Sequence, residues 1–215
     1  MKLDKAIEEI KKVIGIPFKT LYKIEELEGI KIAKGNTGKL LEKIIGLPPG
    51  NTLRDFEDGE LKTNKCNALG KPLETMFISQ LSSRFDDLLN DVKFEDSWIY
   101  EKIDKLLYVP VVKTSENPDD WYFLNYKLVN IEKDSELYNQ LAEDFEIIKK
   151  KINADILIND GFIHTSSGKY IQIRTKDAKP YNPIFSKKLN RFVSNKNFAF
   201  YFQKNFMIDI QSKID

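Results

Sequence analysis

Cysteine and histidine are almost absent from this sequence. Its 215 residues include a single cysteine, Cys66, and a single histidine, His164. A lone cysteine cannot form an internal disulfide, and a lone histidine excludes a metal site built from several imidazoles. We therefore expect a reduced, cytoplasmic protein.

Long hydrophobic runs are also missing. Charged residues make up 31% of the chain, and no apolar stretch approaches the roughly 20 residues that a membrane-spanning helix needs. The N-terminus mixes charges from its second residue onward, which is unlike a secretory signal. Glycine-rich phosphate loops are absent too, so a nucleotide-driven motor or kinase has no support. We expect a globular protein without a membrane partner.

The hydrophobic periodicity alternates between helical and strand-like segments. The expected helices span 3–14, 37–46 (with Thr37 as N-cap) and 136–152, and the expected strands span 59–63, 75–81, 106–112, 121–129 and 169–175. No internal repeat or flexible linker divides the chain. We therefore expect one α/β domain over residues 1–215, with helices packed on a central sheet.

Charge is distributed unevenly, although the formal net charge is only +1. Residues 162–206 contain nine basic residues, one acidic residue and ten aromatic residues, so this segment carries +8 and the rest of the chain −7. A basic region rich in aromatic residues is typical of proteins that bind polyanions such as nucleic acids. A solvated basic face has the same composition, so charge alone leaves both interpretations open.

Two acidic residues and a lysine form the most chemically suggestive cluster. On a strand over 59–63, Glu60 and Lys62 point to the same face, and Asp55 approaches that face from the preceding loop. Two carboxylates suit a hard cation such as Mg²⁺, and Lys62 is placed to orient water or neutralise charge on the phosphorane. Metal-dependent nucleases use this arrangement, although alternating charge is also typical of a solvated strand. Glu42, at the border of a helix's apolar face, either extends the site or lies on the surface.

Seven short blocks of this sequence resemble, in order, the MutH family. The blocks are residues 38–42 (GKLLE), 55–56, 59–63 (GELKT), 72–77, Lys102 with 107–111 (LYVPV), 168–176 (GKYIQIRTK) and 200–206 (FYFQKNF). That family contains the GATC-directed nicking endonuclease of methyl-directed mismatch repair and a set of type II restriction endonucleases. The likeness spans 38–206, whereas the helical N-terminal region 1–37 matches poorly.

The resemblance implies a restriction-endonuclease-like fold, in which helices flank a mixed β-sheet, and a Mg²⁺-dependent endonuclease. It implies Asp55 and Glu60 as metal ligands and Lys62 as the catalytic lysine, with Glu42 and Lys102 in the same site. It implies that residues 162–206 form the DNA-binding region. The implied DNA contacts are Glu74, Arg174, Lys176, Tyr201 and Lys204. The implied reaction cuts double-stranded DNA at GATC or a related palindrome and leaves 5′-phosphates.

Two departures favour a restriction endonuclease over the repair nickase. The spacing from Asp55 to Glu60 is two residues shorter than in the mismatch-repair enzyme, and Thr175 replaces a proline in the recognition block. We then expect a cognate DNA methyltransferase in the same system, and either a homodimer on DNA or a monomer that nicks each strand in turn. A methylation-sensing repair nickase and a catalytically silent DNA-binding module are the alternatives. The presence of Asp55, Glu60 and Lys62 argues against a catalytically silent module.

Overall fold

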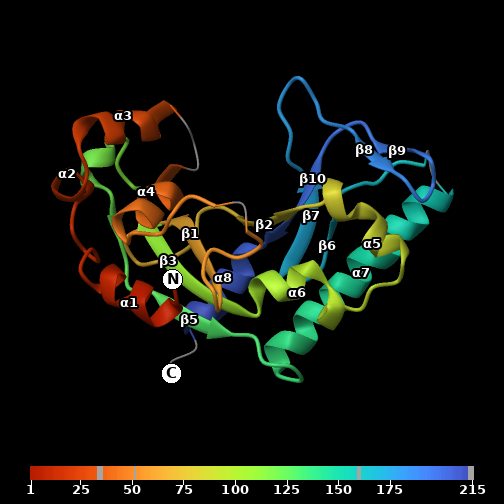
Figure 1. Cartoon of the computed structure of the whole chain (residues 1–215), viewed down its shortest axis with the longest axis horizontal. Helices are drawn as coiled ribbons and strands as arrows, with labels where there is room; N and C mark the ends of the chain where they lie inside the picture. Colours follow the sequence, from red (N-terminus) through yellow and green to blue (C-terminus); the bar gives the residue numbers. More distant parts are fainter. Residues whose placement is uncertain (33–35, 51, 159–160, 213–215) are drawn as a thin grey trace. The chain divides into compact units, whose positions relative to one another are not determined.

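A computed structural model describes residues 1–32, 36–50, 52–158 and 161–212 (Figure 1). The chain forms two compact units: the first contains residues 1–74, 102–130 and 210–215, and the second contains residues 75–101 and 131–209. Each unit combines segments that are far apart in the sequence, so no single break in the chain separates them. The assignment of residues 1–215 to one domain stays a prediction.

The first unit is built on a four-stranded mixed sheet. Its strands are β1 (Glu60–Cys66), β3 (Lys105–Val112), β4 (Tyr122–Phe123) and β5 (Lys127–Asn130). β3 pairs in parallel with β1 and antiparallel with β4 and β5. All of β3 after Lys105 is buried, as expected for a central strand with a nearly continuous apolar sequence. The mixed sheet confirms the predicted fold class.

Four helices in the N-terminal region belong to this unit: α1 (Leu3–Lys11), α2 (Phe18–Leu21), α3 (Ile24–Ile32) and α4 (Asn36–Ile44). Buried side chains such as Ile10 of α1, Leu41 of α4 and Phe123 of β4 share one core. The prediction of Thr37 as an N-cap is wrong, because α4 already begins at Asn36. The Thr37 side chain is buried instead, and its hydroxyl accepts a hydrogen bond from Lys113.

The second unit contains an antiparallel sheet in the order β2–β10–β7–β6, and a separate hairpin, β8–β9. The strands are β2 (Met76–Gln80), β6 (Ser166–Ser167), β7 (Ile171–Thr175), β8 (Ile184–Ser186), β9 (Arg191–Ser194) and β10 (Phe198–Phe202). Its helices include α5 (Phe85–Leu89) and α7 (Glu136–Ile158), and both α6 (Trp98–Ile103) and α8 (Lys204–Ser212) start in this unit and end in the first. Buried aromatic rings join α7 to the sheet, since Phe145 stacks on Phe200 with 6.2 Å between ring centroids.

Several predicted segments differ from the structure in length. The helix predicted over 3–14 ends at Lys11, and the strand predicted over 59–63 continues to Cys66. Residues 121–129 form two short strands, β4 and β5, and not one extended segment, because each pairs with a different part of β3. The helix predicted over 136–152 continues to Ile158. Among the described residues, no helix has both the length and the apolar composition required to cross a membrane.

Candidate active site

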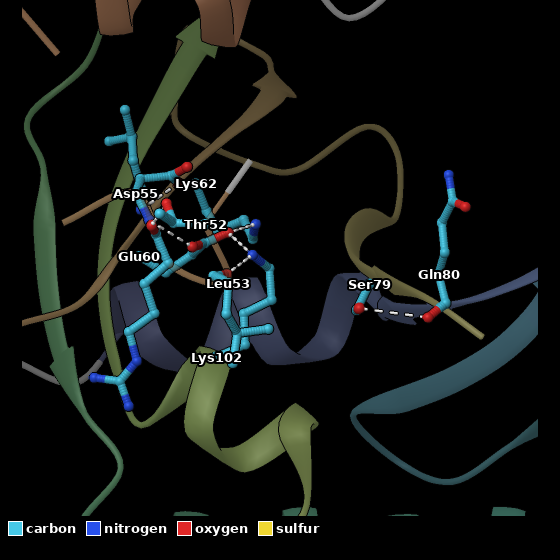
Figure 2. A network of polar contacts seen from close by, with 10 residues as sticks. Thr52, Leu53, Asp55, Glu60, Lys62, Ser79, Gln80 and Lys102 are labelled. Carbon is cyan, nitrogen blue, oxygen red and sulfur yellow. Dashed lines mark hydrogen bonds and ion pairs between the residues drawn. The ribbon is translucent and has the colours of Figure 1, made fainter. Parts of the chain in front are cut away.

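The predicted acidic and lysine cluster lies at the start of β1 (Figure 2). Glu60 is the first residue of the strand, and its side chain is only 2% exposed. Lys62, two residues later, points to the same face and donates a hydrogen bond to Glu60 Oε1. The alternation along the strand therefore places the carboxylate and the ammonium together, as the sequence predicts.

Asp55 reaches this position because the loop before β1 folds back on the strand. The backbone N–H of Asp55 donates to Glu60 Oε2 at 3.1 Å, and the backbone N–H of Leu61 donates to Asp55 Oδ2 at 3.0 Å. The turn at Gly59 permits no side chain, since a Cβ there would lie 2.7 Å from the Leu3 side chain and 2.8 Å from the Lys105 carbonyl oxygen. Close packing of this loop thus fixes Asp55 beside Glu60.

Lys102 joins the cluster from the last turn of α6 (Figure 2). Its Nζ lies 2.7 Å from Glu60 Oε1 and also donates to the Leu53 carbonyl. A second link follows in the same loop, where Arg54 Nη2 donates to Asp104 Oδ2 at 3.0 Å. Leu53 and Arg54, the two residues before Asp55, are therefore held at the C-terminal end of α6. Sequence reasoning missed the pair of Arg54 and Asp104, for which no local pattern gives a signal.

The two acids of the cluster have different electrostatic surroundings. Glu60 Oε1 contacts two ammonium groups, from Lys62 and Lys102. Asp55 is partly buried and lies beside the Glu60 charge. Burial first, and then repulsion from Glu60, raise its pKa to about 6, although the two lysines and the Leu61 N–H act in the opposite direction. An ionised Asp55 is therefore costly in the protein alone, and a bound cation would offset that cost.

The donor set fits a magnesium site. In the part of the chain that the structure describes, no group of three or more His, Cys, Asp or Glu side chains could hold a metal ion. Mg²⁺ needs no such group, because it is commonly held by one or two carboxylates together with waters and substrate phosphates. Asp55 Oδ2 accepts from Leu61, and its other oxygen has no hydrogen-bond partner among the described residues. Both oxygens of Glu60 already have partners in the protein, so the assignment of Asp55 and Glu60 as metal ligands stays a prediction.

Glu42 lies on α4, where this helix faces β1. A methyl group placed on Gly38 would lie 3.5 Å from Thr63 Oγ1 of β1 and 3.9 Å from Glu42 Oε1. Glu42 also lines a surface hollow of about 990 Å³. No hydrogen bond or ion pair within the described residues connects it to Asp55 or Glu60, so its catalytic role stays a prediction.

Three of the predicted DNA contacts meet on the sheet of the second unit. Arg174 Cζ of β7 lies 4.2 Å from the ring centroid of Tyr201 on β10. Lys176 Nζ lies 3.2 Å from the ring of Phe77 on β2, and Phe77 packs edge-on against Tyr201 at 5.7 Å. Burial raises the pKa of Tyr201. Sequence reasoning assigned no role to Phe77, although it closes the resembling block 72–77.

The other two predicted DNA contacts are exposed. Glu74 belongs to the first unit, and its backbone carbonyl accepts from Asn64 Nδ2 at 3.2 Å. Lys204 begins α8. Among the described residues, no hydrogen bond or ion pair links the Lys204 side chain to Arg174, Lys176 or Tyr201. The roles of Glu74 and Lys204 stay predictions.

Cys66 and His164 lie outside the acidic and lysine cluster. Cys66 is fully buried at the end of β1, and burial raises the pKa of its thiol to about 11, so the reactive thiolate is scarce at neutral pH. His164 is exposed in a loop, where its backbone N–H donates to Asp155 Oδ2 at 3.1 Å.

Comparison with known proteins supports the family resemblance found in the sequence. The family model described as "DNA mismatch repair enzyme MutH" matches residues 48–150, which include Asp55, Glu60, Lys62 and Lys102. The chain is 31% identical over 189 residues to the DNA mismatch repair protein MutH of Shigella flexneri serotype 5b, covering 83% of this chain and 77% of that protein. It is 30% identical over 187 residues to the protein of the same name from Escherichia coli K12 DH10B, with the same coverage.

Proposed function

The chain belongs to the MutH family, and from that premise we propose that it is a metal-dependent endonuclease acting on double-stranded DNA. One observation carries the proposal. The buried carboxylate of Glu60 contacts two lysines, and beside it lies Asp55, whose raised pKa makes its ionised form unfavourable. The negative charges of the two carboxylates formally cancel the positive charges of Lys62 and Lys102. A divalent cation then gives the site the positive charge that a phosphodiester requires.

Each residue of the cluster has a distinct part in phosphodiester hydrolysis. Mg²⁺ held by Asp55 and Glu60 would polarise the scissile phosphate and acidify a water molecule. Lys62 orients the attacking water or neutralises charge on the phosphorane. Lys102, which contacts both Glu60 and the Leu53 carbonyl, holds the carboxylate and the Asp55 loop together. The water loses a proton and attacks phosphorus, the bond from phosphorus to the 3′ oxygen breaks, and the leaving 3′ oxygen takes up a proton. The products are a 5′-phosphate and a 3′-hydroxyl.

Sequence recognition is assigned to the sheet of the second unit. Arg174 and Lys176 are exposed on neighbouring positions of one face, and aromatic rings lie against both cationic groups. Arginine and lysine read guanine in the major groove, and each good contact discriminates by about 1–3 kcal/mol. We assign to this face the reading of GATC or a related palindrome.

Two cleavage patterns are compatible with this site. The names of the relatives support a mismatch-repair nickase at least as well as a restriction endonuclease. The short spacing from Asp55 to Glu60 and the threonine at position 175 support double-strand cutting. A restriction enzyme would be accompanied by a DNA methyltransferase and would cut as a homodimer or by sequential nicking, whereas a nickase would depend on the methylation state.

Plasmid cleavage separates these candidates. Supercoiled DNA with unmethylated, hemimethylated or fully methylated GATC sites is incubated with the protein and Mg²⁺, and the Asp55→Asn variant serves as control. Linear product from unmethylated DNA identifies a restriction endonuclease, whereas nicked product, mainly at hemimethylated sites, identifies a repair nickase. Sequencing the ends gives the recognition site. DNA binding without any cleavage would show a silent binding module and refute the proposed activity.

A further inference from the structure

Figure 1 shows the hairpin β8–β9 of the second unit. This hairpin and the residues just before it carry large apolar side chains that are exposed. Phe185 is 44% exposed, Phe192 52%, Tyr181 43% and Leu189 37%. Single exposed apolar residues are ordinary, but several large ones exposed on one short segment, two of them in ring contact, indicate an interaction surface. We call Tyr181, Phe185, Leu189 and Phe192 the hairpin patch.

The two phenylalanines form a rigid cross-strand pair. Phe185 is the register partner of Phe192, and their rings meet edge-on with 5.2 Å between centroids. The neighbouring residues Ile184 and Val193 are fully buried. The alternation of the strands thus points the rings away from the core, and turning them inward would expose the buried side chains.

Asp86 of α5 fixes the turn of this hairpin. Its carboxylate accepts hydrogen bonds from Ser186 Oγ at 2.5 Å, from the Lys187 N–H at 2.9 Å and from the Lys188 N–H at 3.2 Å. At the other end, Arg191 donates to the carbonyls of Ile156 and Gly161. The exposed rings are therefore held in place before any partner binds, which lowers the entropy cost of binding.

Charge identifies the kind of partner. Residues 178–197 contain five basic residues and no acidic residue. Lys179 and Lys187 are exposed, and Lys196 Nζ lies 4.7 Å from the Tyr181 ring in the hairpin patch. Positive charge outweighs negative charge around this surface, although the carboxylates of Asp86 and Asp177 lie beside it. Such a surface is complementary to a polyanion that also offers apolar surface. Duplex DNA does so, because its minor groove accepts apolar side chains while lysines bind the phosphates.

The hairpin also starts and ends at the recognition face. β7 ends at Thr175 and β10 begins at Phe198, so the whole hairpin is an excursion between these two strands. The N–H of Lys176 donates to the Asn197 carbonyl at 2.9 Å, which closes the base of the excursion. The base of the hairpin therefore adjoins the ends of the two strands that carry Arg174 and Tyr201.

We propose that the hairpin patch is a second DNA contact, which binds the minor groove of the duplex outside the recognition sequence. The inference rests on the proposed function, because it presumes that the recognition face binds DNA. The Phe185–Phe192 pair supplies the apolar contact, and Lys179, Lys187 and Lys196 bind flanking phosphates. The contact adds affinity and leaves the choice of recognition sequence to Arg174 and Lys176.

The test compares two duplexes that share the same central site. One is trimmed to the recognition sequence, and the other extends it by one helical turn on each side. Binding of the full chain is measured by fluorescence anisotropy in the Asp55→Asn background. Combining Phe185→Ala with Phe192→Ala should weaken binding to the extended duplex about tenfold and leave the trimmed duplex unaffected. Ile147→Ala is the matched control, since Ile147 is also 44% exposed but lies on α7.

Salt dependence separates the two kinds of contact. Lys187→Gln should reduce the slope of log affinity against log salt by about 0.9 on the extended duplex, whereas the phenylalanine variants should leave this slope unchanged. Equal affinity of the parent and the double phenylalanine variant for the extended duplex would overturn the inference alone. If the double phenylalanine variant loses self-association and keeps its DNA affinity, the inference is also overturned. The hairpin patch then binds a second copy of the chain. A parent that binds neither duplex would overturn the proposed function as well.

Discussion

Replacing Asp55 by asparagine should stabilise the protein while abolishing cleavage. The pKa of Asp55 is raised from 3.8 to about 6, first by burial and then by repulsion from Glu60. At about 1.4 kcal/mol per pH unit, ionising this group in the folded protein costs at most about 3 kcal/mol. Because Asp55 is only partly buried, water screens some of this cost, and we expect a gain of about 1–2 kcal/mol for the asparagine variant.

The raised pKa of Asp55 determines the pH range in which the asparagine variant is more stable than the wild type. A carboxyl group with a raised pKa binds more protons in the folded than in the unfolded state between pH 3.8 and about 6. The stability that the protonated group contributes is complete below the unfolded pKa and is lost as the pH rises through the folded pKa. The difference between Asp55→Asn and wild type should therefore be largest above about pH 6 and vanish near pH 4.

Urea denaturation without Mg²⁺, at about pH 8 and again near pH 4, measures this difference. The asparagine keeps a carbonyl oxygen that can accept the Leu61 N–H. Asp96→Asn is the control, because Asp96 is exposed and should show no such gain. Mg²⁺ should then raise the melting temperature of the wild type but not of Asp55→Asn. If Asp55→Asn is no more stable than wild type at about pH 8, or if the difference is equal at both pH values, the account of a costly Asp55 charge is wrong.

Three further substitutions test the other groups. Lys62→Ala should lower the cleavage rate at least 100-fold with DNA affinity retained in a gel-shift assay, and cleavage at the wild-type rate would refute the catalytic assignment. Lys176→Ala should relax sequence discrimination by about 1–3 kcal/mol, measured by competition between cognate and single-mismatch duplexes, and unchanged discrimination would contradict it. Arg54→Ala should raise the Mg²⁺ concentration needed for half-maximal cleavage, and combining Arg54→Asp with Asp104→Arg should restore part of the loss. An Arg54→Ala protein with unaltered Mg²⁺ dependence would show that the link to α6 does not position Asp55.

Local sequence determined the part of the site that lies on one strand. Period-two alternation places Glu60 and Lys62 on the same face, and the structure confirms their contact. The buried run of β3 and the long helix α7 were likewise visible as apolar patterns, because a pattern of this kind depends only on neighbouring residues. The chemistry of two carboxylates and a lysine could therefore be proposed before any tertiary contact was known.

Packing between distant segments decided the rest. Lys102 and Asp104 meet the Asp55 loop across about 50 residues of chain, and Lys176 meets Phe77 across about 100. Such contacts follow from strand register and from how a helix end docks on a loop, neither of which appears in local periodicity. The exposure of the hairpin patch was hidden for the same reason, because Phe185 and Phe192 look like ordinary core residues in the sequence. Only the fold, which buries Ile184 and Ser186 beside Phe185 and Val193 beside Phe192, turns the two rings outward.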